Sequence, residues 1–148
     1  MKKYLLTLIF LTFISCSEGY EQNFDSYADF SKANQRNKSW FPEIIFSDAT
    51  NLKNFSYLRS HTVFGSFNYT NHKKYDSIFL VSEKVDQKSL QRKLLTIEKL
   101  RPDWIENTDS IKFDSLELVK FGHFYLAKNN SKSKILYWNI GEKNKNGL

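Results

Sequence analysis

The sequence predicts an α+β domain in which a small antiparallel sheet of about five strands carries two packed helices. Three observations lead to this fold class. Residues 61–70 alternate between apolar and other side chains, residues 116–140 contain three strand candidates in a row, and residues 86–101 have helical periodicity. Successive strands with short connections pair as antiparallel neighbours, and an amphipathic helix buries its apolar face against them.

The first helix candidate begins after Ser26. Ser26 and Asp29 form a capping-box pattern, and apolar residues then recur at three-residue spacing. We expect this helix to end near Asn37, because Trp40 and the residue before Pro42 belong to a turn. Trp40 should plug the edge of the core.

The second helix candidate has the clearest pattern. Asp86 can cap its first turn, and its apolar residues recur at helical spacing, namely Leu90, Leu94 and Ile97. It should stop by Arg101, because Pro102 follows.

The strand candidates differ in how they are covered. Residues 61–70 predict a half-buried strand, whereas the continuous apolar run 78–81 predicts an interior strand that forms a hairpin with it. Tyr137 and Trp138 point to opposite faces, so both sides of the last strand should be covered. The three final candidates are Leu116–Phe121, His123–Lys128 and Ile135–Ile140.

The first sixteen residues have the pattern of a secretion signal. Lys2 and Lys3 precede an apolar run from Tyr4 to Ile14. Eleven helical residues cover about 16 Å, roughly half of the hydrocarbon layer, so a cleaved signal is favoured over a membrane span.

Ser15 and Cys16 end that run and resemble the lipobox of bacterial lipoproteins, although Phe13 stands where the family usually has leucine. The resemblance implies that Cys16 receives a diacylglyceryl group, a palmitate-type modification, and becomes the first mature residue. Ser17 is not the aspartate that retains such proteins at the inner membrane, which favours export to the outer membrane. The alternative is an ordinary signal peptide ending at Cys16. Since Cys16 is the sole cysteine, an intramolecular disulfide is excluded.

The chain therefore divides into a signal peptide, a lipidated cysteine with a flexible tether, one domain and a polar tail, at residues 1–15, 16–24, 25–141 and 142–148. Aromatic residues make up 16% of the sequence, which suffices for a core despite its polar average. The lysines behind the net charge of +6 are scattered, so we attribute that charge to solubility. We expect a monomer.

The segment from Trp40 to Leu52 resembles, with its flanking helix and strand, a pattern in a small uncharacterised bacterial protein family that carries no assigned activity. Its side chains Trp40, Glu43, Asp48 and Asn51 are the candidate binding residues. The competing interpretation is that Asp48 and Asn51 form turns by bonding their own backbone.

The sequence contains little sign of catalysis. His61, His72 and His123 share no metal-ligand spacing, and phosphate-binding glycine loops and nucleophile elbows are missing. We therefore predict no metal, no cofactor and no nucleic-acid partner, and whether the protein is an enzyme stays uncertain.

These observations predict a membrane-anchored envelope lipoprotein with a non-enzymatic binding or structural role. The expected partner is a protein or a glycan, held on an exposed sheet face by aromatic side chains. One alternative is an inhibitor or immunity protein against a toxin or lytic enzyme. The other is a small hydrolase in which Glu43, Asp48 or a histidine converges with a second polar group.

Overall fold

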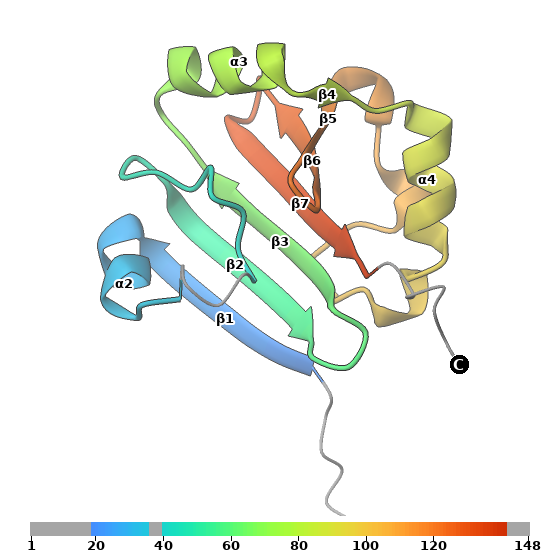
Figure 1. The fold of residues 1–148 in the computed structure, drawn as a ribbon, viewed down its shortest axis with the longest axis horizontal. Coiled ribbons are helices and arrows are strands. Elements are labelled where there is room, and N and C mark those ends of the chain that lie inside the picture. Colours follow the sequence, from blue (N-terminus) through green and yellow to red (C-terminus); the bar gives the residue numbers. More distant parts are fainter. Residues whose placement is uncertain (1–18, 36–39, 142–148) are drawn as a thin grey trace, which may run out of the picture.

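In the computed structural model, which describes residues 19–35 and 40–141, one antiparallel sheet is covered on both faces (Figure 1). Its seven strands lie in the order β1-β2-β3-β7-β6-β5-β4. They are β1 Gly19–Ser26, β2 Thr50–Tyr57, β3 Thr62–Asn68, β4 Glu83–Lys84, β5 Glu117–Phe121, β6 Phe124–Asn129 and β7 Lys134–Ile140. The described helices are α2 Tyr27–Lys32, α3 His72–Val81 and α4 Gln87–Leu95, with short 3-10 turns at Glu98–Leu100, Thr108–Ser110 and Phe113–Ser115.

Two meanders meet in the middle of the sheet. The first runs from β1 through β3, and the second from β5 through β7. β7 pairs with β3, so Phe64 lies opposite Trp138 and Asn68 opposite Lys134. The predicted α+β class is confirmed, but the sheet has seven strands rather than about five.

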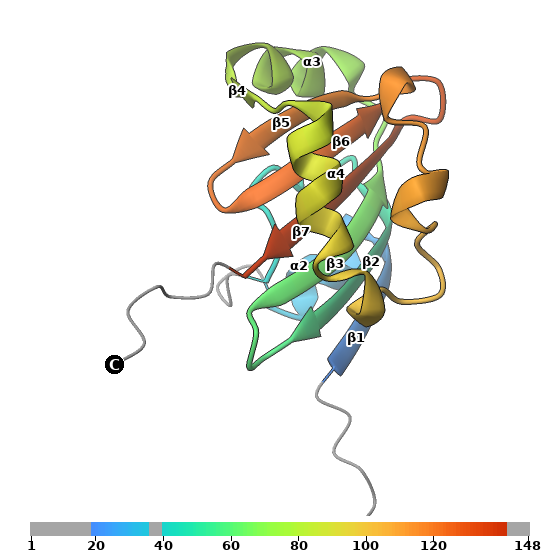
Figure 2. The same ribbon diagram turned by 90° about the vertical axis from the view of Figure 1, so that its right-hand side faces the viewer.

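The sheet separates two apolar cores. Val63, Phe67 and Tyr137 belong to the core on the α3 face, which α2, the loop 40–49 and α3 cover. Phe64 and Trp138 belong to the core on the α4 face, covered by α4 and the segment 97–116 (Figure 2). As predicted, both sides of the last strand are covered. β3 was predicted to be half-buried, which is wrong, because the two cores cover both of its faces, Val63 and Phe67 on one side and Phe64 on the other.

The predicted tether 16–24 is wrong from Gly19 onward. Residues 19–26 pair along their length with β2 as an edge strand. Their polar composition suits an edge strand, in which alternate side chains face water. The domain therefore begins at Gly19 instead of residue 25, while Cys16, the signal peptide 1–15 and the tail 142–148 lie outside the described residues.

Helix α2 begins as predicted but ends early. The Ser26 hydroxyl accepts the Asp29 amide at 3.2 Å and donates to the Asp29 carboxylate at 2.6 Å. The helix ends at Lys32, and Asn34 has a φ of 50° in the left-handed region that terminates helices. The expected end near Asn37 lies outside the described residues.

The predicted interior strand at 78–81 is wrong, because these residues end helix α3. Tyr75 and Phe79 are buried on one side of that helix, whereas Leu80 and Val81 are 77% and 85% exposed. The Asn71 side chain accepts the Lys74 amide at 3.2 Å and caps the helix. A run of four apolar residues is too short to distinguish a strand from the end of a helix.

The second predicted helix and the final strands are confirmed. Asp86 accepts the Ser89 amide at 2.8 Å at the start of α4, and the predicted apolar residues are buried, Leu90 and Leu94 in the helix and Ile97 just after it. Gly122, with a φ of 58°, forms part of the turn between β5 and β6. Within the described residues, we find no helix of the length and hydropathy that crossing a membrane requires.

Candidate functional site

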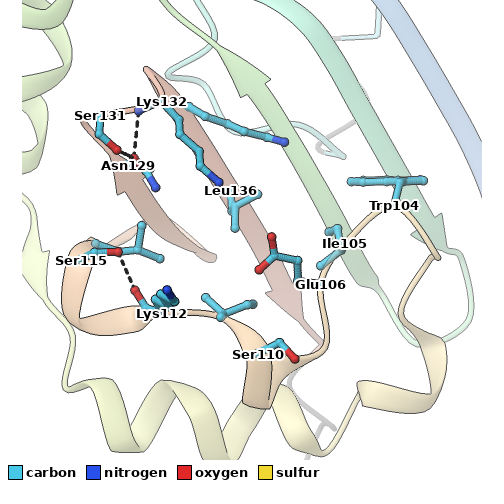
Figure 3. Close-up of a pocket in the computed structure, with 13 residues that line it drawn as sticks. Trp104, Ile105, Glu106, Ser110, Lys112, Ser115, Asn129, Ser131, Lys132 and Leu136 are labelled. Atoms are coloured by element: carbon cyan, nitrogen blue, oxygen red, sulfur yellow. Dashed lines mark hydrogen bonds between the residues drawn. The ribbon is translucent and has the colours of Figure 1, made fainter.

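A hollow of about 400 Å³ opens on the α4 face between the segment 104–116 and the β6–β7 hairpin. We call it the lysine cleft. Figure 3 shows Trp104, Ile105 and Glu106 on one side of it and Asn129 and Lys132 from the hairpin on the other. Its lining residues are Trp104, Ile105, Glu106, Ser110, Ile111, Lys112, Ser115, Leu116, Asn129, Ser131, Lys132, Lys134 and Leu136.

The cleft carries an excess of positive charge. Lys112, Lys132 and Lys134 are in the lining, whereas Glu106 is the one carboxylate there. Lys53 of β2 adds a further ammonium group, 5.8 Å from the centre of the Trp104 ring. The charged side chains thus surround a floor that includes Ile105, Ile111, Leu116 and Leu136.

The charge of Lys134 is only partly compensated. Burial lowers the pKa of the Lys134 ammonium, and repulsion from Lys53 and Lys132 lowers it further, while Glu106 opposes the shift. A lysine with a lowered pKa is one whose charged form is destabilised by its surroundings. An anion entering the cleft would therefore stabilise the charged form of Lys134.

The β6–β7 hairpin fixes one side of the cleft. The Asn129 carboxamide oxygen accepts the Lys132 amide at 3.0 Å and the Ser131 hydroxyl at 2.8 Å, which closes the turn (Figure 3). Ser133 then adopts a φ of 47° before β7 begins. Strand alternation places Lys134 on the same face as Leu136, above the second core.

A polar network holds the opposite wall. Glu98 accepts the Arg101 Nε at 2.9 Å and the Thr108 hydroxyl at 2.5 Å, so it bridges both ends of the loop that carries Trp104. Arg101 also donates to the Ile105 carbonyl and, at 2.5 Å, to the Asn107 side chain. Burial alone would raise the pKa of Glu98, but the bonds from Thr108 and Arg101 lower it below the ordinary value.

Trp104 leaves one donor of this wall unused. Its indole Nε1 is buried and finds no hydrogen-bond acceptor among the described residues. Such a group costs free energy unless an acceptor reaches it. Because this nitrogen is buried, the donors that a ligand in the cleft can reach are the lysine ammonium groups.

The four binding residues predicted from the sequence do not form this site. Trp40 stacks on His61 at 5.9 Å between ring centroids, beside the start of β3. Asp48 lies at the other end of β3, where its carboxylate accepts the amides of Thr70 and Asn71 at 2.9 and 2.8 Å. Asn51 has a φ of 49° at an irregularity of β2, and the side chain of Glu43 is exposed. None of the four lines the cleft.

The three histidines lie apart, His61 and His123 in turns and His72 at the start of α3. His61 is bound to Trp40 by stacking, His72 lies 3.2 Å from the Ser133 hydroxyl, and His123 adjoins Phe124. In residues 19–35 and 40–141, histidine, cysteine and acidic side chains form no group of three that could hold a metal ion.

Sequence reasoning missed the cleft residues for a physical reason. Lys132 lies in a turn and Lys134 at the start of a strand, and lysine is common at such solvated positions. Lys53 and Lys112 are distant in sequence, and the order of the strands brings Lys53 near the cleft while the packing of the segment 97–116 on the sheet brings Lys112 there. The one local signal was Trp104 next to a proline turn, which indicates an anchoring ring without indicating a ligand.

These features define a small α+β domain with a cationic, partly apolar binding cleft. A family model described as YbbD head domain matches residues 18–68, which include β1, α2, β2 and β3. The chain is similar to that family over this part, and the match begins directly before β1. No curated protein and no solved structure matches the chain.

Proposed function

We propose that this chain is an exported lipoprotein of the bacterial envelope, anchored through acyl chains on Cys16, whose domain binds an acidic segment of a partner protein in the lysine cleft. The proposed role is binding without a catalytic step. The observation that carries it is the hollow itself, in which Lys112, Lys132 and Lys134 face a single carboxylate, Glu106, over apolar side chains.

The composition of the cleft supports an acidic polypeptide as ligand. Carboxylates would relieve the repulsion between the ammonium groups, and apolar side chains next to them would cover the floor around Leu136. A hollow of about 400 Å³ lies in the range of ligand pockets and accepts a few side chains at most. Hence we favour a short acidic loop over a large flat interface.

The sequence analysis expected the partner on an exposed face of the sheet, and this place has less support than the cleft. The strands in the middle of the sheet are buried on both sides, so aromatic side chains there are unavailable. An inhibitor or immunity protein remains a special case of our proposal, in which the acidic loop belongs to a toxin or lytic enzyme. The hydrolase alternative has less support, because Glu106 is the one carboxylate in the cleft lining.

The anchor is tested by the intact mass of the protein from its native membrane fraction. We expect a chain that begins at Cys16 and carries the mass of two or three acyl chains. A Cys16→Ser variant should lose both the lipid and the membrane association. A wild-type chain that is exported without acyl groups would refute the anchor.

The cleft is tested by titrating the protein with a hexaglutamate peptide. A Lys132→Gln/Lys134→Gln variant should bind roughly tenfold more weakly, because two ammonium groups leave the site. The matched control, Lys88→Gln/Arg92→Gln, removes the same net charge from exposed positions of α4. Equal losses in both variants would show attraction by net charge alone and would refute the site.

A further inference from the structure

The start of β1 lies very close to the proposed anchor. Only Ser17 and Glu18 separate Cys16 from Gly19, the first residue of the sheet. Three residue steps of extended chain span at most about 11 Å. A domain of this size has a radius of gyration of about 14 Å, so a lipid on Cys16 holds one end of the domain against the bilayer.

That end is formed by the β2–β3 hairpin. Gly19 pairs with Tyr57, the last residue of β2, so the turn that follows Tyr57 lies beside the start of β1. Two large side chains are exposed here, Leu58 at 59% and Tyr20 at 58%. At the other end of this turn, Trp40 stacks on His61, the residue directly before β3.

We propose that this hairpin docks on the membrane, with Leu58 and Tyr20 entering the interfacial layer of the bilayer. The inference rests on the lipid anchor of the proposed function. Leu58 is an apolar side chain that protein leaves uncovered, and tyrosine is enriched at the boundary between lipid and water. Single contacts of this kind are weak, but acyl chains within about 11 Å make them intramolecular.

Docking in this way fixes the direction in which the cleft faces. β7 is antiparallel to β3, and Lys134 pairs with Asn68 at the end of β3 opposite to the hairpin turn. Helix α3 also lies at that far end, as both views show (Figures 1 and 2). The β6–β7 hairpin with Lys132 would then point away from the bilayer, toward a partner.

The sole native cysteine makes a direct test possible, because acylation blocks its thiol and leaves an introduced cysteine as the single reactive site. The full chain is prepared as Leu58→Cys and as Leu80→Cys, labelled with an environment-sensitive dye, and reconstituted in vesicles that contain lipids with a quencher in the headgroup. Leu80 is the matched control, since it is also an exposed leucine but lies on α3.

We expect roughly twofold quenching at position 58, because a docked side chain reaches the headgroup layer, and no quenching at position 80. Equal quenching at both positions, or none at position 58, would overturn the docking. Intact mass of the same samples separates the two proposals. Acylated protein without quenching at position 58 refutes the docking alone, whereas unacylated protein refutes the anchor and the docking together.

Discussion

Two lysines in neighbouring strands lie in opposite electrostatic surroundings. Lys128 of β6 points to the α3 face, where it is 1% exposed and forms ion pairs with Asp76 and, at 3.0 Å, with Glu117. Its Nζ also lies 4.9 Å from the Phe79 ring centroid. Lys134 of β7 points to the other face, where Lys53 and Lys132 repel it and Glu106 is the one carboxylate that acts on it.

The pKa directions follow from these neighbours. Burial alone would lower the pKa of Lys128, but its bonds to Asp76 and Glu117 raise it above the ordinary lysine value. Burial lowers the pKa of Lys134, and its lysine neighbours add to that effect. The comparison teaches that the buried ammonium of Lys128 is already paired within the fold, whereas the half-buried ammonium of Lys134 can gain a partner from a ligand.

The largest effect that we expect of substituting the two lysines is on stability. Lys128→Ala should lower the free energy of unfolding by about 2–4 kcal/mol, because it removes a buried stem and unpairs two carboxylates. Lys134→Ala should change it by less than about 0.5 kcal/mol, since lost packing is offset by relieved repulsion. Urea unfolding of both variants measures the difference.

A Lys128→Met variant sharpens that test. Methionine keeps the apolar stem, and Asp76 and Glu117 are 56% and 44% exposed, so water can solvate them. Replacing a buried ion pair by an apolar side chain is often close to neutral, so we expect less than about 1.5 kcal/mol. Equal free energies of unfolding for Lys128→Ala and Lys134→Ala would contradict the difference in surroundings between the two lysines.

Glu98 holds the wall of the lysine cleft together through Arg101 and Thr108. Glu98→Gln should cost about 1–2 kcal/mol after allowance for partial exposure, because two charge-assisted bonds are weakened. The pKa of Glu98 is lowered in the folded state, so its contribution is present above the unfolded value of 4.5 and is lost as pH falls through the folded pKa.

Urea unfolding at several pH values measures this contribution. The wild type should lose its advantage over Glu98→Gln in acid, while Lys128→Ala, which leaves Glu98 in place, should keep the acid dependence. A difference between Glu98→Gln and wild type that is constant with pH would contradict the assignment.

The comparison also shows what the sequence could predict. Helix α4 and the final meander have long periodic patterns and a clear cap at Asp86, so local rules suffice for them. The strand prediction for residues 78–81 failed, because four apolar side chains fit the period of a strand and that of a helix equally well. The burial of Phe79 over Lys128 favours the helix. Strand β1 was not predicted, because an edge strand needs few apolar residues.

The candidate site was less predictable than the fold. The bonds of Asp48 are not those of the turn interpretation, since its carboxylate accepts the amides of Thr70 and Asn71, 22 and 23 residues further along the chain. Lys128 and Lys134 look alike in the sequence, each in a strand near a polar turn. Which of them meets carboxylates depends on the packing of α3 and of the 97–116 segment, and local patterns carry no such information.

Binding of the acidic probe should depend on the pKa of Lys134 and not on that of Lys128. The lowered pKa means that Lys134 loses its proton below the ordinary value of 10.5, whereas Lys128 keeps its proton through the same window. Affinity for hexaglutamate should therefore fall about threefold as pH rises through the folded pKa of Lys134. Titrations of wild type and Lys134→Gln test this, because the variant should bind weakly with a flatter pH profile.

The smallest expected effect concerns Leu80, which lines the hollow over Lys128 together with Asp76 and Glu117. Leu80→Ser should change the free energy of unfolding by less than about 0.5 kcal/mol, because the side chain faces water at the end of α3. The adjacent Phe79→Ala should cost about 3–5 kcal/mol, since that ring is buried against Lys128. Urea unfolding of the pair distinguishes a helix with one buried side from the interior strand that the sequence predicted, in which both substitutions would be costly.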